Sequence, residues 1–344
     1  MMIRRIYLSV LFVLFSSPLF AEEVVLNANH PQNYEVVKGD TLWDISGKFL
    51  DKPWQWPEIW QVNPQIKNPH LIYPGDMISL SYINGRPVLS LTRGSTAYKM
   101  SPEAREIKLE QAISTIPRSA IAAFLSKPLV VSEETLNSAP YIVASTDERL
   151  ALGAGDQAYV KGLPDDDSKL FSVFRGGDVY TDPETGEVLG YEAIYTAEAS
   201  LKRAGEIAKV MLNKTTREVL AGDRLLPVDD DSDVMNFFPR SPEQEINGRI
   251  ISVYDGVSQI GQYQVIVLNR GSREFLESGH VLTVMRAGNT ISDGVTADRD
   301  DTVTLPDESA GIAMVFKVFE KVSYALVMKA TRAIHINDKV VSVE

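Results

Sequence analysis

The sequence predicts an α+β protein: an N-terminal βααβ module, a helical connector, and two mainly antiparallel domains of β-barrel or β-sandwich type. Two observations support this fold class. Apolar residues at helical spacing occur between residues 33 and 139, next to short strand-like runs. From residue 140 onward, short apolar or alternating runs recur between Gly, Asp and Pro residues, a pattern typical of antiparallel β-domains.

Composition is that of an ordinary globular protein. The 344 residues correspond to about two domains, and the 44% hydrophobic and 23% charged residues exclude disorder throughout the chain. A net charge of −12 argues against nucleic-acid binding and against binding to an anionic membrane. The absence of cysteine excludes disulfides, zinc–thiolate sites and a cysteine nucleophile, and no two of the four histidines are close in sequence. We therefore expect no metal and no cofactor.

Residues 1–21 have the organisation of a secretory signal peptide. A pair of arginines precedes the apolar run Ile6–Phe15, and helix-breaking Ser16–Pro18 and a small residue, Ala21, follow. The apolar run is too short to span a bilayer. The sequence predicts cleavage after this segment, export to the periplasm and no transmembrane segment in the mature chain. An uncleaved membrane anchor is the alternative.

A small βααβ module is predicted over residues 33–82. A strand-like run at Tyr34–Val37 leads through the turn Lys38–Asp40 to a start resembling a capping box at Thr41. The apolar residues that follow lie on one face of a helix: Leu42, Ile45, Phe49 and Leu50.

Prolines delimit the rest of this module. Pro53 ends the first helix, Pro57 begins the second, and Asn63–Pro64 ends it. Tyr73–Asp76 has Pro and Gly at the central positions of a type II turn, and Met77–Tyr82 alternates as a closing strand.

These residues resemble a LysM domain, a βααβ module that binds peptidoglycan. The stretches that carry the resemblance are YEVVKGDTLWDIS and WPEIWQVNPQIKNPHLIYPGDMISL, in which GDTLW, NP and IYPGD stand in the order and spacing of that family. The sequence departs from the family pattern by the insertion Asp51–Trp56 between the helices. The resemblance implies binding of glycan that contains N-acetylglucosamine.

The LysM resemblance also implies where the sugar binds. The family holds N-acetylglucosamine in a shallow groove between the first strand–helix loop and the second helix–strand loop. Carried over to this sequence, the two loops contribute Gly39, Asp40, Thr41 and Leu42, and Asn63, Pro64, Gln65 and Ile66. Backbone N–H and C=O groups with one aliphatic side chain suit an acetamido sugar. The alternative is that Gly39, Asp40 and Pro64 only form turns.

All four tryptophans lie in this segment of the chain. A domain of this size needs large aromatic side chains to build a core, so we expect Trp43 and Trp60 in the core. Trp54 and Trp56 lie on the insertion and are more available as a contact surface.

Residues 83–139 form the predicted connector with short helices. The connector begins with strand-like alternation over Ile83–Arg93. Ser101–Glu103 begins one helix, which Pro117 ends, and Ser119–Leu125 is a second helical stretch. Its apolar residues need burial, so we expect the connector to pack against a neighbouring domain.

Two β-rich domains are predicted over residues 140–227 and 248–344, separated by an acidic, proline-containing linker at 228–247. In the linker, Phe237–Pro239 is expected to dock against a barrel or to contact a partner. The two domains resemble diverged copies of one unit, and two similar small barrels are the simplest explanation. Three local correspondences support the repeat: Gly155–Val160 with Gly279–Val284, Gly205–Val210 with Gly311–Phe316, and Ala221–Leu225 with Ile336–Val340.

This combination of parts resembles the type IV pilus secretin-associated (TsaP) family, whose C-terminal region is like that of the flagellar assembly protein FlgT. The stretches that carry the resemblance are VASTDERLALGAGDQAYVKGL, FRGGDVYTDPETGEVLGYEA, GRIISVYDGVSQIGQYQVIVLNRGSREFLESGHVLTV and LPDESAGIAMVFKVFEKVSYALVMKATRAI. The resemblance implies a periplasmic, ring-forming component that holds the outer-membrane secretin to peptidoglycan. A wall-bound scaffold or regulator of a peptidoglycan hydrolase or a flagellar machine is the alternative.

The motifs of wall-cleaving enzymes are missing from the sequence. Zinc amidases need clustered His and acidic residues, and a Ser-x-x-Lys acyl-enzyme motif does not occur. A glycosidase needs only one or two carboxylates, but such wall enzymes are largely helical. The acidic runs Asp165–Asp167 and Asp229–Asp233 lack the spacing of a calcium loop, and His280 and His335 lie in strand-like runs. We therefore expect no catalytic residue and no metal ligand.

Overall fold

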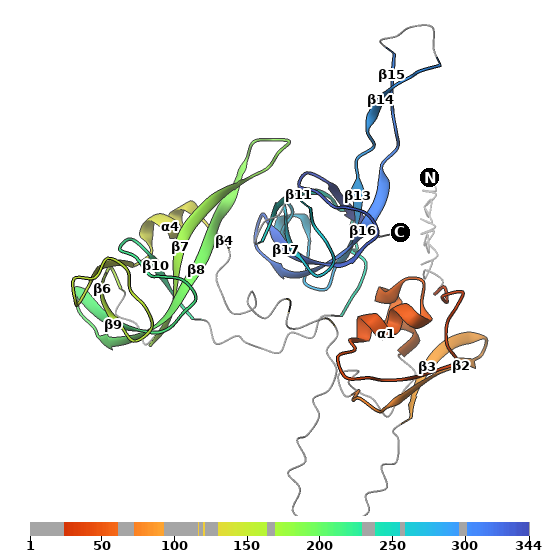
Figure 1. Cartoon of the computed structure of the whole chain (residues 1–344), viewed down its shortest axis with the longest axis horizontal. Helices are drawn as coiled ribbons and strands as arrows, with labels where there is room; N and C mark the ends of the chain where they lie inside the picture. The colour runs from red at the N-terminus through yellow and green to blue at the C-terminus, as the bar shows by residue number, and fades with distance from the viewer. Residues whose placement is uncertain are drawn as a thin grey trace, which may run out of the picture.

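The computed structural model shows an N-terminal module followed by two β-barrels (Figure 1). The predicted signal peptide, the four groove residues at 63–66, and residues 101–125, where the connector helices are expected, lie outside the described residues, except for Ile116 and Ala120. The structure describes residues 24–60, 72–92, 116, 120, 130–163, 169–228, 238–254, 259–295 and 301–343.

The N-terminal module (residues 24–92) places short helices on a three-stranded antiparallel sheet of order β1-β2-β3. Leu42, Ile45 and Phe49 are buried in its core, as the helical spacing predicts. Its elements are β1 (Asn33–Glu35), α1 (Leu42–Phe49), η1 (Pro53–Gln55), α2 (Trp56–Trp60), β2 (Met77–Ile83) and β3 (Arg86–Thr92).

Strand β3 extends the module beyond residue 82, into residues that the sequence analysis placed in the connector. It pairs with β2 along its whole length, from Ile83↔Arg86 to Met77↔Thr92. The turn between the strands is Asn84–Gly85, where both residues have positive φ angles of 52° and 79°. An Asn-Gly pair with this backbone is the preferred two-residue hairpin turn, so the local sequence carried a signal for β3.

The first barrel is a ring of six strands. Its sheet has the order β4-β8-β7-β10-β5-β6-β9, and an additional β8–β9 pairing closes the ring and leaves β4 outside it. Residues 130–138, expected in the connector, provide β4 and α4 of this domain. Its elements are β4 (Val130–Val131), α4 (Glu133–Ser138), β5 (Tyr141–Ser145), β6 (Gln157–Lys161), β7 (Leu170–Thr181), β8 (Val188–Arg203), β9 (Ile207–Thr215) and β10 (Arg224–Pro227).

The second barrel is closed, with the strand order β11-β12-β17-β16-β13-β18. A two-stranded hairpin, β14–β15, interrupts the connection from β13 to β16 and extends away from the barrel (Figure 1). Its elements are β11 (Asn247–Val253), β12 (Val265–Leu268), η2 (Ser272–Glu274), β13 (Val281–Arg286), β14 (Thr290–Ser292), β15 (Thr302–Thr304), β16 (Glu308–Val318), β17 (Ser323–Ala330) and β18 (Lys339–Ser342).

The two barrels have the same topology. When the ring strands of each are numbered from one to six along the chain, both follow the cyclic order 1-2-5-4-3-6. The isolated bridge Leu152↔Val219 in the first barrel has its counterpart in Ile260↔Ile334 in the second. A β-bulge also follows equivalent residues, Val173 and Val284, in the third strands. The barrels are therefore two copies of one structural unit.

The topology corrects two of the three correspondences expected from the sequence. Gly155–Val160 runs into the second strand of its barrel, whereas Gly279–Val284 runs into the third strand. Gly205–Val210 and Gly311–Phe316 likewise belong to the fifth and the fourth strands. The remaining pair, Ala221–Leu225 and Ile336–Val340, does lead into equivalent sixth strands.

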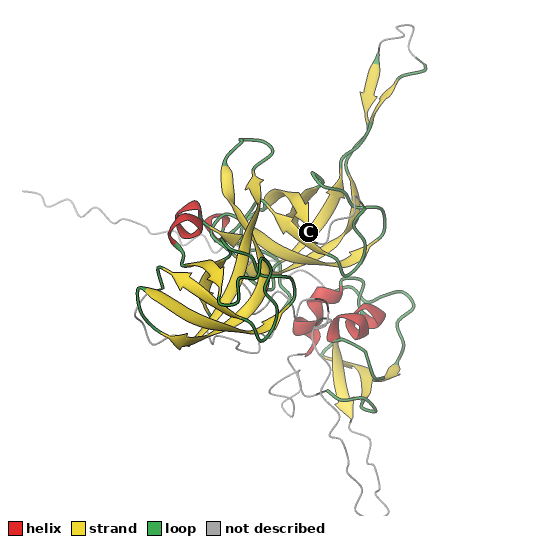
Figure 2. Cartoon of the chain, turned by 60° about the vertical axis from the view of Figure 1, so that its left-hand side comes forward, coloured by secondary structure: helices red, strands yellow, loops and turns green. Residues whose placement is uncertain are grey.

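The outer face of the second barrel is apolar and is covered by other parts of the chain. Tyr324 is fully buried there in one cluster with Trp43 and Trp54 of the N-terminal module. The Tyr263 hydroxyl also donates to Asp44 Oδ1 of α1 at 3.2 Å. Figure 2 shows the helices of the module on the side that faces this barrel. The other barrel residues in the cluster include Val265, Val267, Met314, Phe316, Leu326 and Met328.

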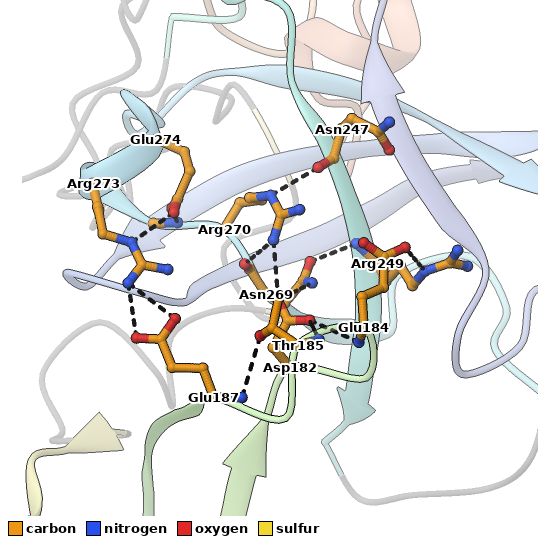
Figure 3. Close-up of polar contacts among 11 residues, drawn as sticks. Asp182, Glu184, Thr185, Glu187, Asn247, Arg249, Asn269, Arg270, Arg273 and Glu274 are labelled. Atoms are coloured by element: carbon orange, nitrogen blue, oxygen red, sulfur yellow. Dashed lines mark hydrogen bonds and ion pairs between the residues drawn. The ribbon is translucent and has the colours of Figure 1, made fainter.

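A long hairpin of the first barrel, which we call the first arm (residues 176–193), also docks on this face. The Tyr180 hydroxyl lies 3.0 Å from the Tyr324 hydroxyl, and both side chains are buried. Asp182 Oδ2 accepts a hydrogen bond from Asn269 Nδ2 at 2.9 Å (Figure 3). The tip of the arm thus places an aromatic ring and a carboxylate against the second barrel.

Ion pairs surround this contact (Figure 3). Glu187 lies 2.9 Å from Arg273 and 2.8 Å from Lys321, and Glu184 lies 2.7 Å from Arg249. The tip of the arm is acidic and the receiving edge of the barrel is basic, so charge complementarity directs the docking.

The docked arm is expected to loosen in acid. Hydrogen bonds from Arg273 and Lys321 lower the pKa of Glu187 from 4.5 to about 2. Burial alone would raise the pKa of Asp182, but hydrogen bonds from two backbone N–H groups and the Asn269 amide hold it below its usual value. A carboxylate whose pKa is lower in the folded than in the unfolded chain stabilises the folded state while it is ionised. The contact of the arm with the second barrel should therefore hold above pH 4.5 and weaken as the pH falls toward about 2.

Hydrogen exchange of the arm, measured across this pH range, checks the expectation. In a Glu187→Gln chain the glutamine cannot titrate, so protection of the arm at neutral pH should fall and its pH dependence should flatten. Identical pH profiles for the native and the substituted chain would show that this carboxylate does not control the docking.

Candidate functional site

The first candidate loop, residues 39–42, begins α1. Thr41 is the N-cap of the helix: the Asp44 N–H donates to Thr41 Oγ1 at 3.1 Å. The Thr41 N–H and hydroxyl both donate to Asp44 Oδ2, at 3.3 and 2.7 Å. This reciprocal arrangement is the capping box that the sequence predicts. It fixes the direction in which the loop enters the helix.

Gly39 and Asp40 form the turn that precedes this cap. Gly39 has φ +100°, a conformation that L side chains rarely adopt. Asp40 Oδ2 accepts hydrogen bonds from the Val37 N–H and the Tyr34 hydroxyl, each at 2.9 Å. Burial and this carboxylate raise the pKa of Tyr34 to about 12, so the tyrosine remains protonated and donates to Asp40.

A second turn lies beside the first. The Gly75 N–H donates to Val36 O at 2.8 Å, and the Val36 N–H donates to Asp76 O at 2.9 Å. The Asp76 side chain accepts the Tyr73 N–H at 3.0 Å. These hydrogen bonds fix the two loops relative to each other at one end of the sheet.

The same turn occurs elsewhere in the chain, where no sugar site is expected. In each case an aspartate accepts the N–H of the residue three positions earlier, and the residue just before the aspartate has positive φ. The aspartates are Asp40, Asp76, Asp156, Asp223 and Asp338. Gly39 and Asp40 therefore have a structural role that is independent of any ligand.

The predicted groove residues differ in what they can offer a ligand. Gly39 is exposed and Asp40 is half-buried, whereas Thr41 and Leu42 are 4% and 2% exposed. Thr41 and Leu42 therefore contribute through the backbone and the core rather than through exposed side chains. Asn63, Pro64, Gln65 and Ile66 lie outside the described residues, so the structure describes one side of the predicted groove.

The tryptophans are all buried, and their partners differ from those expected. Trp60 packs in the core of the module, as predicted, together with Trp56. Trp43 stacks on Trp54, with ring centroids 6.4 Å apart, in the cluster on the outer face of the second barrel. The insertion therefore builds a contact between two parts of the chain. Of the two tryptophans on the insertion, Trp54 makes this contact, whereas Trp56 lies in the core of the module.

The apolar linker residue Phe238 packs against this part of the module. Its ring lies 6.1 Å from that of Trp56, and it keeps 44% of its surface exposed. A small cavity of about 330 Å³ adjoins the contact, between the insertion and the linker. Its lining residues are Trp54, Gln55, Pro57, Glu58, Pro239, Arg240 and Ser241.

The histidine predicted to be structural at position 280 lies against backbone. His280 is 3% exposed and its Nδ1 accepts the Glu277 N–H at 3.1 Å. Burial and the charge of Arg240 lower its pKa, which favours the neutral ring. Among the described residues, no group of three or more His, Asp or Glu side chains is placed to hold a metal ion.

In the parts of the chain that the structure describes, no helix has both the length and the apolar character needed to cross a membrane.

Comparison with known proteins identifies the N-terminal module. Residues 34–81 match the LysM domain family. Over 60 residues the chain is 40% identical to the uncharacterized protein YqbP of Bacillus subtilis (strain 168), an alignment that covers 14% of this chain and 27% of that protein. The module is therefore of LysM type, which indicates binding of peptidoglycan or a related glycan. The family match ends before the two barrels begin.

Proposed function

We propose that this chain is a non-enzymatic anchor that attaches a cell-envelope assembly to peptidoglycan in the periplasm. The observation that carries the proposal is a LysM module joined to two barrels of the same topology, whose interiors are filled by apolar side chains. A peptidoglycan zymogram tests the non-enzymatic part, and we expect no cleared band.

In the proposed binding mode, the sugar lies between the loop at residues 39–42 and the loop at residues 63–66. The rigid turn and capping box hold the first loop in place without a ligand, so little ordering is needed on binding. The second loop supplies an aliphatic side chain for the acetyl methyl group, for which we propose Ile66.

Ile66→Asp is expected to weaken binding to purified peptidoglycan by about tenfold or more, because losing one buried aliphatic contact costs about 1.5 kcal/mol. A sedimentation assay with wall sacculi measures this loss. The matched control is Ile83→Asp, on the same module at an exposed position (46% exposed) beside the β2–β3 turn. Equal binding by both variants and the native chain would remove Ile66 from the site.

For the assembly partner we propose the outer-membrane secretin of type IV pili, on the basis of the sequence resemblance. Co-purification from crosslinked envelopes tests it, with the Ile66→Asp chain in place of a deletion. Removing the whole module would expose the apolar outer face of the second barrel, and this face would then bind other proteins nonspecifically. Secretin recovered with both chains supports the proposal. Recovery of wall hydrolases or flagellar proteins in its place would contradict it.

A further inference from the structure

The first arm has an equivalent in the second barrel. In the first barrel the arm lies between the paired residues Arg175 and Ile194, just after the bulge in the third strand. At the same place in the second barrel, Arg286 pairs with Glu308. The residues between them, 287–307, form what we call the second arm, which includes β14 and β15.

The two arms carry the same pattern when counted from these base residues. We count forward from Arg175 or Arg286 on the first strand of each arm, and backward from Ile194 or Glu308 on the second strand. The residues five positions from the base are the apolar ones that the first arm buries. The residues seven positions from the base are the two acidic residues with which the first arm docks. The pairs of residues are Tyr180 and Ile291, Asp182 and Asp293, Glu187 and Asp301, and Leu189 and Val303.

The local geometry of the arms is also the same. The Asp182 N–H donates to Glu187 O at 2.9 Å, and the Asp293 N–H donates to Asp301 O at 2.9 Å. Each of these aspartates uses Oδ1 to accept the N–H two residues further on, at 2.8 Å in the first arm and 2.9 Å in the second. The second arm therefore presents its acids on the same backbone frame as the first.

The arms differ in what covers them. In the first arm, Tyr180 and Leu189 are each 6% exposed, because the second barrel covers them. In the second arm, Ile291 is 48% and Val303 is 44% exposed. Figures 1 and 2 both show the second arm extending away from the barrels and the module. An apolar and acidic docking surface is therefore presented to solvent.

The first barrel offers the surface that matches it. The first arm docks on Asn269 and Tyr324 of the second barrel, and the repeat places Lys161 and Lys209 at these two positions of the first barrel. Tyr159 pairs with Lys209 across β6 and β9, just as Val267 pairs with Tyr324 across β12 and β17.

This surface of the first barrel is amphipathic and basic. Arg203 lies opposite Lys209 on β8, so three cations including Lys161 share the receiving face with the ring of Tyr159. Glu206 occupies the position in the first barrel that is equivalent to Lys321 in the second. It is an acidic residue where the second barrel has a basic one. The three cations still outnumber this acid, so the receiving face is opposite in charge to Asp293 and Asp301.

We propose that the second arm docks on the outer face of the first barrel of another copy of this chain. The contact repeats between molecules the contact that the first arm makes within one molecule. Each copy then offers one solvent-exposed arm and one solvent-exposed receiving face, so the association is head-to-tail and propagates from copy to copy. The inference concerns a surface separate from the sugar groove and goes beyond the proposed function, because it needs no glycan.

Sedimentation velocity of the exported chain over a concentration series tests the proposal. The native chain should form species larger than a dimer. Association should weaken by about tenfold or more in an arm variant, Asp293→Lys with Asp301→Lys. It should weaken by a similar factor in a face variant, Lys161→Glu with Lys209→Glu. A chain that carries all four substitutions should associate again, because the charges are exchanged. This rescue separates docking from misfolding.

Two further variants complete the test. Asp147→Lys with Glu148→Lys makes the same change in charge at exposed positions of the first barrel, and should associate like the native chain. Glu206→Lys restores the cation that the first arm uses at Lys321, and should strengthen association several-fold.

A native chain that stays monomeric at its highest soluble concentration would overturn the proposal, as would unchanged association of the arm variant.

Crosslinking gives an independent readout, because the chain contains no cysteine. Asp293→Cys and Lys161→Cys in one chain should give a ladder of disulfide-linked multimers on mild oxidation. Asp293→Cys with Asp147→Cys should not. Equal crosslinking in both chains would contradict a specific contact between the second arm and the receiving face.

Discussion

Asp223→Ala is expected to lower the free energy of unfolding of the first barrel by about 3 kcal/mol, whereas Asp338→Ala lowers that of the second barrel by about 1 kcal/mol. The two aspartates occupy the same turn of the repeat. Asp223 is 2% exposed and accepts the Leu220 N–H at 3.0 Å, and it also binds Arg175 at 2.8 and 3.0 Å. The Ala variant removes both the turn hydrogen bond and the ion pair.

Asp338 serves as the matched control for this comparison. It accepts the equivalent N–H from His335 at 2.8 Å, and the His335 imidazole lies 4.0 Å away. Its replacement therefore removes mainly the turn hydrogen bond. Chemical denaturation followed by hydrogen exchange reports each barrel separately, which is needed because a chain of several domains does not unfold in two states. Equal losses in the two barrels would show that the Arg175 pair contributes nothing.

Local patterns in the sequence predicted the elements whose causes are themselves local. The capping box at Thr41 and the turn at Gly39–Asp40 depend on residues within three positions of each other. The hairpin turn at Asn84–Gly85 is equally local. The strand-like alternation over Ile83–Arg93 was recognised, but it was assigned to the connector and not to the sheet of the module. The groove could be placed only by family resemblance, because the local signal at Asn63–Pro64 predicts the end of a helix and says nothing of a ligand.

The correspondence between the barrels was harder to predict. Short segments that begin with Gly and continue with alternating apolar residues look alike, whichever strand of the barrel they enter. Gly155–Val160 and Gly279–Val284 illustrate this, because they enter strands that are not equivalent. Only pairing between distant strands distinguishes them, and that information is not contained in any local window.

The covered outer face of the second barrel did leave a signal in the sequence. In the first barrel, β6 alternates buried and less buried residues, as a strand with one solvated face should. In the second barrel, β12 is a continuous apolar run whose four residues are all buried, and β17 is similar. A continuous apolar strand in an antiparallel barrel predicts burial on both faces, but it does not say which segment covers the outside.

Trp43→Ala is expected to release the N-terminal module from the second barrel at a cost of about 3–5 kcal/mol, whereas Trp60→Ala should unfold the module itself. Both residues are on helices of the module and both are buried, at 4% and 6% exposure. Trp60 packs within the module core, but Trp43 packs on Trp54 and the outer face of the second barrel. The two substitutions therefore remove similar areas from different contacts.

Hydrogen exchange distinguishes the two outcomes. In the Trp43→Ala chain, strands β1–β3 should keep their protection from exchange, while the amides of β12 and β17 should exchange faster. The radius of gyration measured by small-angle X-ray scattering should increase. In the Trp60→Ala chain, β1–β3 should lose protection. Loss of protection in β1–β3 of both chains would mean that Trp43 supports the module fold rather than its attachment. If Trp43→Ala does release a folded module, peptidoglycan binding should persist in that chain, because the loop at residues 39–42 keeps its turn and its cap without the barrel.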